Sequence, residues 1–299
     1  MNNPKLWIFL ALGVIGLVYL FSWARALAAG RARANGPAVP TPLQTGIGFV
    51  TNFFDTLGIG SYAPTTALFR FFKLVPDEKI PGTLTLGHTL PTIVQSFIFI
   101  AIVRVDLKTL VLLIGASIVG AWLGAGVVAR WPKRNIQIGM GLALVAAAAL
   151  FTMANLGIVA AGGTAVGLSG ARLIAGIIGN FILGALMTLG IGLYGPCLIM
   201  ISLLGMEPRT AFPIMMASCA FLMPVAGVRF SREQAFSARP ALGLALGGVP
   251  AVLIAALWVK SMPLNTVRWL VVAVVLIAAT GLLRSARQTR VATAGPPVP

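Results

Sequence analysis

The sequence has few charged residues and very few acids. Only 9% of its 299 residues are charged, only 6 are Asp or Glu, and 58% are hydrophobic. A typical soluble domain is about 25% charged and about 45–50% apolar. A soluble protein of this size is therefore excluded, because it needs more charge to cover its surface, and a disordered chain is excluded by the high hydrophobicity. The class that remains is a multi-pass helical membrane protein.

Cysteines and catalytic motifs are also scarce. The 2 cysteines are too few for a disulfide scaffold. No phosphate-binding glycine loop, HExxH or GxSxG motif occurs, so we expect neither an enzyme nor a cofactor or metal centre. The net charge of +16 does not indicate nucleic-acid binding, because the basic residues form short clusters between apolar runs. Such clusters are typical of topology signals and of contacts with membrane lipids.

Six apolar stretches are about long enough to span a bilayer. They cover residues 82–103, 109–129, 135–157, 210–228, 240–259 and 265–283. A seventh stretch lies near the N-terminus and is followed by three arginines. These arginines favour a cytoplasmic location for the C-terminal end of that stretch. We therefore predict a retained N-terminal transmembrane helix over 1–29, rather than a cleaved signal peptide, with the N-terminus outside and a linker over 30–42.

The chain contains an internal repeat. Residues 56–64 and 188–196 share seven of nine positions at an offset of 132. The repeat predicts two homologous halves, 43–157 and 172–283, joined by a connector over 158–171. Repeated halves of this kind are typical of secondary transporters.

Each half opens with an apolar segment that Gly and Pro interrupt. A continuous helix over 43–75 would be about 50 Å long, too long for a hydrocarbon core of about 30 Å, and each piece alone is too short. A re-entrant hairpin of two half-membrane helices fits better, and 172–206 repeats the pattern. Two hairpins place 15 Lys and Arg on one side and 7 on the other, whereas single crossings divide them 12 to 10. The positive-inside rule favours the hairpins.

The predicted fold class is an all-α integral membrane protein with an inverted repeat. Each half is a re-entrant hairpin followed by three transmembrane helices, and the N-terminal helix is extra. Three crossings are an odd number, so the second half is inverted and both hairpin tips lie at mid-membrane. A basic, Pro-rich tail over 284–299 is predicted to be disordered and cytoplasmic.

The interrupted segments predict an anion site. Pro64 and Pro196 suit the first position of a new helix, so two helix N-termini, with free N–H groups and partial positive charge, should point at mid-membrane. Glycines permit the turns, and hydroxyls lie beside them. The alternative is that these residues only allow close helix packing. The candidate substrate-binding residues around the two breaks are Thr56, Gly58, Gly60, Ser61, Tyr62, Thr65, Thr66, Thr188, Gly190, Gly192, Tyr194 and Cys197.

Three further candidates, Asp55, Thr85 and His88, are polar residues within apolar surroundings. The last two belong to a polar helix face formed by Thr85, His88, Thr89, Thr92, Gln95 and Ser96. A carboxylate within the membrane is costly and is a functional candidate, with His88 or the hairpin N–H groups as its partner. Its presence beside an anion requires that Asp55 be protonated or bind a cation, so proton coupling is a hypothesis. Alternatively, Asp55 and His88 are satisfied by local hydrogen bonds and only stabilise packing.

The sequence resembles the TauE/SafE family of sulfite exporters and sulfonate permeases over about residues 43–283. The resemblance is carried by the repeated Gly-Ile-Gly-x-Tyr-x-Pro segments, by Ile80-Pro81-Gly82-Thr83, by Val105-Asp106-Leu107, by Gly115, Gly120, Gly124 and Ala125, and by Pro132. It implies a bacterial inner-membrane permease for small sulfur-containing or organic anions. The sequence departs from the family at Ser61 and Tyr62, where further glycines are frequent.

Two other functions stay open at this point. Asp55, His88 and the Cys and Met residues of the second half would also suit a cation or metal permease, because sulfur ligands suit Cu(I). A non-transporting membrane partner protein is the other alternative, although the sequence has no long soluble tail. Homo-oligomerisation is open as well.

Overall fold

The computed structural model describes residues 4–33, 39–58, 60–76, 79–127, 162–187, 192–232 and 235–261, with scattered residues between 134 and 156 and between 269 and 287. Within these residues all regular elements are helices, and five of the helices are long and apolar enough to cross a membrane. The prediction of an all-α fold is therefore confirmed over the described residues, and the five helices are compatible with the predicted membrane protein. The predicted spans 135–157 and 265–283 and the predicted tail lie largely outside the described residues.

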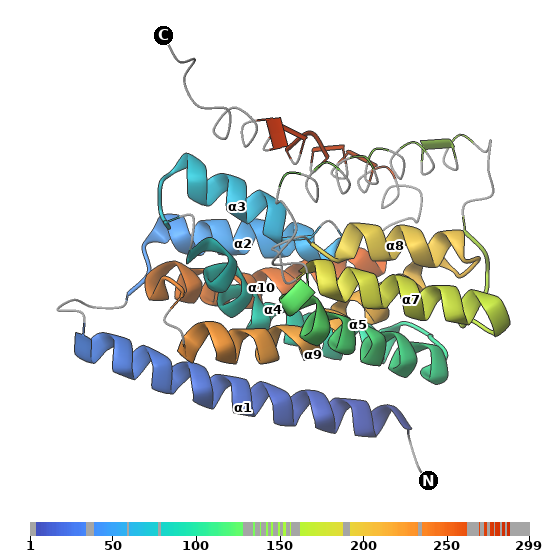
Figure 1. Cartoon of the computed structure of the whole chain (residues 1–299), viewed down its shortest axis with the longest axis horizontal. Coiled ribbons are helices and arrows are strands. Elements are labelled where there is room, and N and C mark those ends of the chain that lie inside the picture. The colour runs from blue at the N-terminus through green and yellow to red at the C-terminus, as the bar shows by residue number, and fades with distance from the viewer. Residues whose placement is uncertain are drawn as a thin grey trace.

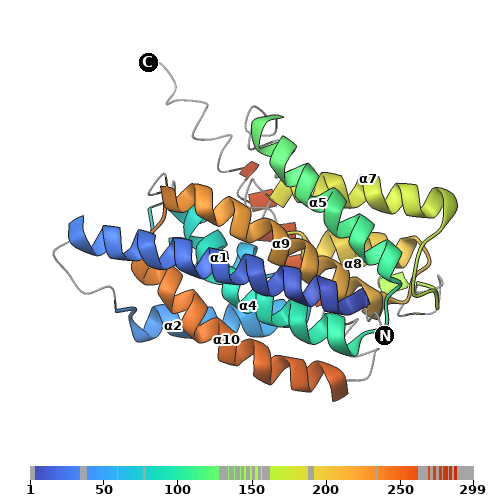
Figure 2. The ribbon, with the colours of Figure 1, turned by 90° about the horizontal axis from the view of Figure 1, so that it is seen from below.

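The long helices fall close to the predicted apolar stretches. The sequence-predicted spans correspond to α1 (Pro4–Arg33), α4 (Ile80–Ile102), α5 (Leu107–Val127), α9 (Ala211–Arg232) and α10 (Ala238–Ser261). The first of these, α1, continues four residues past the predicted boundary at 29. It lies along the outside of the bundle over α4 and α9 (Figure 2). On its inner side, the hydroxyl of Tyr19 donates a 2.5 Å hydrogen bond to the carbonyl of Leu86.

The two interrupted segments are pairs of helices, and three of the four helices are short. The exception is α7, which is one of the five helices long and apolar enough to cross a membrane. The first pair is α2 (Pro42–Thr56) and α3 (Tyr62–Phe71), and the second is α7 (Gly170–Met187) and α8 (Tyr194–Leu203). In each pair the second helix runs back along the first, and the two pairs extend inward from opposite ends of the molecule (Figure 1). Thr41 caps the first helix of the first pair through a capping box with Gln44. The pairs therefore bring their turns together in the middle of the bundle.

The turn between α2 and α3 depends on glycine. Gly58 and Gly60 have φ angles of +92° and +85°, in the left-handed region that other residues rarely adopt. One expectation is wrong in detail: Pro64 and Pro196 occupy the third positions of α3 and α8, because both helices begin two residues earlier. The ring is tolerated there because the first four N–H groups of a helix have no partner within it.

The hairpins pack against helices of the other half through small residues. α2 packs along α10, and α7 packs along α5. A Cβ added to Gly247 would lie 2.0 Å from the Thr45 carbonyl oxygen, and one added to Gly120 would lie 1.9 Å from the Phe181 carbonyl oxygen. Glycine at such positions lets helix backbones approach closely in a membrane protein. These contacts hold each hairpin firmly against a long helix.

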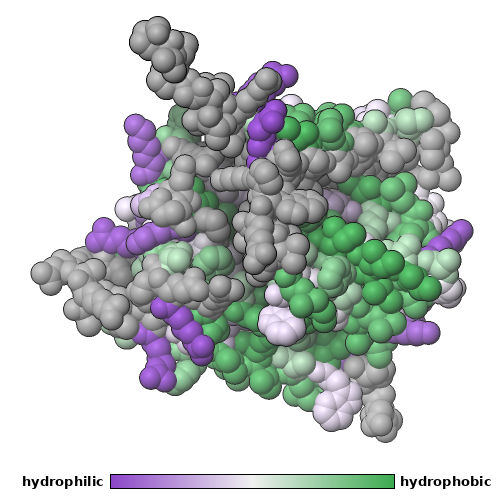
Figure 3. Space-filling model, viewed as in Figure 1, coloured by the Kyte–Doolittle hydropathy of each residue, from purple (hydrophilic) through white to green (hydrophobic). Residues whose placement is uncertain are grey.

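The surface is arranged as expected for a protein in a bilayer. On the face shown in Figure 3, hydrophobic side chains occupy the region between the two ends, and hydrophilic side chains lie at its margins. The outer face of α1 is exposed and apolar, with Trp7 at 69% and Leu17 at 68% exposure. Side chains of this kind are stable in contact with lipid tails.

Candidate functional site

A small cavity lies where the two hairpin turns meet. Its volume of about 10 Å³ is enough for about one water molecule. The residues that line it come from both hairpins and from α4 and α9. They are Asp55, Gly60, Ser61, Tyr62, Thr92, Met187, Gly192, Leu193, Tyr194, Cys219 and Met223.

Most of the lining residues are related by the sequence repeat. Four pairs are separated by the repeat offset of 132, namely Asp55 and Met187, Gly60 and Gly192, Ser61 and Leu193, and Tyr62 and Tyr194. The three other lining residues lie on α4 and α9, which occupy equivalent places in the two halves. The cavity thus lies between equivalent parts of the two halves. Its chemistry is unequal at two of the four pairs, because Asp55 and Ser61 contribute oxygen where Met187 contributes sulfur and Leu193 contributes carbon.

The carboxylate of Asp55 forms one polar wall of the cavity. It is 2% exposed and accepts a 2.9 Å hydrogen bond at Oδ2 from Nε2 of Gln95. Ser61 also hydrogen-bonds this carboxylate through its hydroxyl and its backbone. The turn that begins α3 and the middle of α4 therefore hold Asp55. Of the two partners that the sequence left open, the hairpin backbone contacts Asp55, whereas His88 contacts Asn52 and Thr65 instead.

Gln95 connects the two hairpins. Its Nε2 donates to Asp55 and also to Oγ1 of Thr56, at 3.0 Å. Its Oε1 accepts a 2.7 Å hydrogen bond from the hydroxyl of Tyr194 in the second hairpin. The side chain is completely buried. Every polar atom of this amide is therefore used to tie the tips of both hairpins to α4.

His88 lies behind the cavity rather than in it. Its Nδ1 is 3.0 Å from Oδ1 of Asn52, and its Nε2 is 3.1 Å from Oγ1 of Thr65. A neutral ring satisfies both contacts, with Nδ1–H donating to the amide oxygen and the threonine hydroxyl donating to Nε2. The ring has no exposed surface. These contacts join α4 to both helices of the first hairpin.

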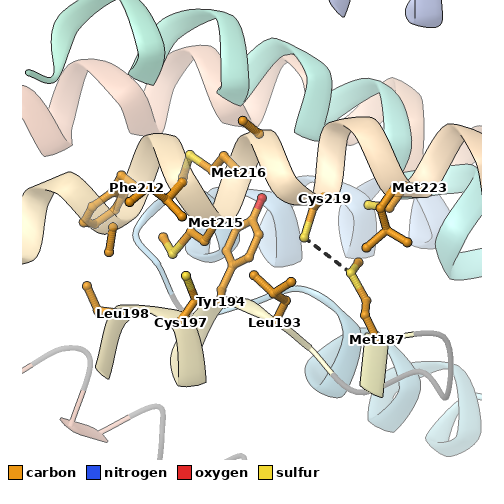
Figure 4. Close-up of a cluster of buried hydrophobic side chains, with 14 of the residues drawn as sticks. Met187, Leu193, Tyr194, Cys197, Leu198, Phe212, Met215, Met216, Cys219 and Met223 are labelled. Carbon is orange, nitrogen blue, oxygen red and sulfur yellow. Dashed lines mark hydrogen bonds between the residues drawn. The ribbon is translucent and has the colours of Figure 1, made fainter. Parts of the chain in front are cut away.

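The second half provides a sulfur-rich wall. The thiol of Cys219 donates to Sδ of Met187 at 3.4 Å, and Met223 lies one helical turn further along α9 (Figure 4). All three line the cavity. Their apolar, polarisable surface contrasts with the hydroxyls and carboxylate opposite. Cys197 is buried in the adjoining hydrophobic core and does not reach the cavity.

The predicted site residues divide into three groups. Six line the cavity: Asp55, Gly60, Ser61, Tyr62, Gly192 and Tyr194. Seven do not line it: Thr56, Gly58, Thr65, Thr66, Thr85, His88 and Cys197. Thr85 is nevertheless tied to the site, because the Tyr62 hydroxyl donates to its Oγ1 at 3.2 Å. Thr188 and Gly190 lie outside the described residues.

The sequence prediction did not include five lining residues. Met187 and Leu193 are repeat equivalents of Asp55 and Ser61, so the offset would have identified them. Thr92 belongs to the predicted polar face of α4. Cys219 and Met223 are candidates only for the alternative of a cation or metal permease, as members of the Cys and Met residues of the second half.

The site offers hydrogen-bond donors but no metal-binding cluster. α3 and α8 both begin at the cavity, with Ser61, Tyr62 and Tyr194 beside the first free N–H groups. Among the described residues, no group of three or more His, Cys, Asp or Glu could hold a metal ion. No protein-family model, curated protein or solved structure matches the chain.

Proposed function

We propose that the protein is a secondary transporter of small anions, built as an inverted repeat whose two re-entrant hairpins meet at mid-membrane. The observation that carries this proposal is the cavity between the hairpin turns, which is lined by four pairs of repeat-related residues. Transporters with inverted repeats bind substrate at the repeat interface, where discontinuous helices direct their N-termini at anionic groups. The opposite directions of the two hairpins support the inversion (Figure 1).

The donor set favours an anion of small size. The N-termini of α3 and α8 provide partial positive charge, and Ser61, Tyr62 and Tyr194 provide hydroxyls. The resemblance to TauE/SafE permeases narrows the substrate class to sulfite and sulfonates. It also implies a bacterial inner-membrane location, for which we propose an outer N-terminus and a cytoplasmic C-terminus, with no catalytic activity.

The cavity has room for about one water molecule. A sulfonate is larger than this, so the two hairpin tips must separate before it binds. Tyr62 and Tyr194, at repeat-related positions on opposite hairpins, both line this space. We infer that substrate enters when one hairpin moves relative to the other.

Flux into proteoliposomes tests the proposal. Purified protein should carry labelled sulfite in a saturable manner, and unlabelled sulfonates should compete. Gly192→Ala should lower this flux, because it adds a methyl group beside the cavity. Gly46→Ala is the matched control, since an added Cβ meets no atom within 4 Å at either glycine and Gly46 lies away from the cavity. Sulfite and sulfonate fluxes equal to those of protein-free liposomes would overturn the proposal.

A cation permease is the second candidate, and the sulfur wall favours it. Cys219, Met187 and Met223 line one cavity with Asp55, and soft sulfur ligands suit Cu(I). Uptake of Cu(I) or Ag(I) that fails in Cys219→Ser, with no anion flux, would establish this function in place of the first.

A further inference from the structure

We propose that Asp55 is the single residue that binds a coupling proton, and that each monovalent anion is carried together with one proton. This inference rests on the proposed anion transport. It deepens that function by assigning the coupling ion and the residue that holds it.

The first argument is the charge around Asp55. Its titratable neighbours are Tyr62 on α3, Tyr194 on α8 and Cys219 on α9, and these groups carry no positive charge. From α4 it meets the neutral Gln95. α7 contributes Met187 to the same cavity, and the face of α10 that packs on α2 contains glycines. No cationic side chain is therefore among the described neighbours of this carboxylate.

The second argument follows from the electrostatics of a buried carboxylate, because Asp55 is 2% exposed. A buried carboxylate without a cation is costly, and a second negative charge beside it is costlier still, because the low dielectric strengthens their repulsion. The cavity must therefore gain one positive charge when a monovalent anion enters. A proton on Asp55 meets this requirement without any new ligand.

The hydrogen bonds favour a proton over a sodium ion. The Gln95 amide and the Ser61 hydroxyl and backbone approach the carboxylate as neutral partners. A metal cation would have to displace these donors and collect several oxygen ligands. The cavity has room for about one water molecule. A proton needs neither the space nor the ligands.

His88 is excluded as the proton carrier by its position. Both ring nitrogens are engaged, with Asn52 and with Thr65, and the ring does not line the cavity. A proton on His88 would have no contact with an anion between the hairpin tips. His88 is thus a structural residue that supplies a matched control.

Proton transfer to Asp55 needs only water as the carrier. A carboxylate oxygen of Asp55 takes a proton from a hydronium ion that enters with the substrate, so an O–H bond forms as one O–H bond of hydronium breaks and a water molecule is left. The neutral carboxyl group then donates a hydrogen bond to the anion, while Gln95 still donates to the other oxygen. When the anion leaves on the far side, water takes the proton back.

The experiment compares Asp55→Asn with His88→Gln in proteoliposomes, with an alkyl sulfonate whose own group does not titrate near neutral pH. In the wild type and in His88→Gln, an inward proton gradient should drive accumulation, and membrane voltage should have little effect. In Asp55→Asn the proton gradient should lose its effect, and flux should follow the voltage. Unchanged proton-driven accumulation in Asp55→Asn, or a sodium requirement in the wild type, would overturn the inference.

A measurement on the wild type tests the proton coupling even where a variant does not fold. Calorimetric titration of the alkyl sulfonate in buffers of different ionisation enthalpy should show uptake of about one proton per bound anion, by the linkage of proton and ligand binding. Binding without proton uptake would overturn the coupling inference and leave anion transport standing. An absence of both sulfonate binding and flux would instead refute the proposed function.

Discussion

The hydroxyl of Tyr194 donates a 2.7 Å hydrogen bond to Oε1 of Gln95, a residue 99 positions earlier in the chain. Tyr194 begins α8 in the second hairpin, whereas Gln95 lies in α4 of the first half. The same amide donates to Asp55 in the first hairpin. One side chain therefore fixes the relative positions of both hairpin tips. Movement of either tip away from α4 must break at least one of these bonds.

Gln95→Leu should destabilise the closed structure. The substitution leaves the Tyr194 hydroxyl and the Asp55 carboxylate without this partner, and each buried unpaired group costs about 1–3 kcal/mol. Tyr194→Phe leaves only Oε1 of Gln95 without this partner and should cost about 1–3 kcal/mol, less than Gln95→Leu. Thermal unfolding in detergent would measure both. Equal melting temperatures for Gln95→Leu and the wild type would show that the bridge does not stabilise the protein.

The internal repeat made much of this arrangement predictable. The identity of residues 56–64 with 188–196 predicted two equivalent interrupted segments, and the described helices contain both. The repeat could not reveal the bridge, because the equivalent of Gln95 is Gly227, which has no side chain. Six polar residues share one face of α4, and only the position of that helix along its neighbours decides that Gln95 and Thr92 reach the hairpin tips.

The level of each residue along α4 also explains why His88 is not the partner of Asp55. Asp55 and His88 are the two titratable residues that stand out in the apolar first half, so their pairing was one of the two alternatives that the sequence left open. His88 lies seven positions before Gln95, about two helical turns away. The contacts with Asn52 and Thr65 satisfy the ring nitrogens of His88 at its own turn of α4. The contact of α4 with Asp55 comes about two turns later, at Gln95. Sequence spacing alone does not fix which turn of one helix faces a given turn of another.

His88→Ala should lower stability with little effect on substrate affinity. The variant leaves Oδ1 of Asn52 and the hydroxyl of Thr65 without their present partner, at about 1–3 kcal/mol each. The side chain does not line the cavity, so the KM for the transported anion should stay within about twofold of the wild-type value. A lost contact with the anion worth about 1.4 kcal/mol of binding energy would instead raise the KM about tenfold. Melting temperature and KM measured on one preparation check this. A large rise in KM at unchanged stability would place His88 in the binding site.

Gly120→Ala should destabilise the protein far more than Gly115→Ala. Both residues lie in α5, so the gain in helix propensity is the same. The Cβ of alanine at position 120 would lie 1.9 Å from the Phe181 carbonyl oxygen in α7, whereas at position 115 it meets no atom within 4 Å. Overpacking of this kind costs about 1–3 kcal/mol. A lower melting temperature for Gly120→Ala alone is expected. Similar values for the two variants would argue against the tight packing of α5 on α7.

Single cysteines at Lys73 and Arg209 should react from opposite sides of the membrane. Lys73 follows the end of α3 and Arg209 follows the end of α8, and both side chains are exposed. The ends of these two short helices point in opposite directions (Figure 1). The two native cysteines, Cys197 and Cys219, are buried, so the wild type supplies the unlabelled control.

In intact cells, a membrane-impermeant maleimide should label Arg209→Cys and should label Lys73→Cys only after the cells are broken. This assignment follows from the excess of Lys and Arg on the side to which Lys73 belongs, since such residues stay in the cytoplasm. Labelling of both positions from one side would mean that one of the interrupted segments crosses the membrane completely. The two helix N-termini would then no longer face each other from opposite halves, and the anion site would lose the symmetry on which it depends.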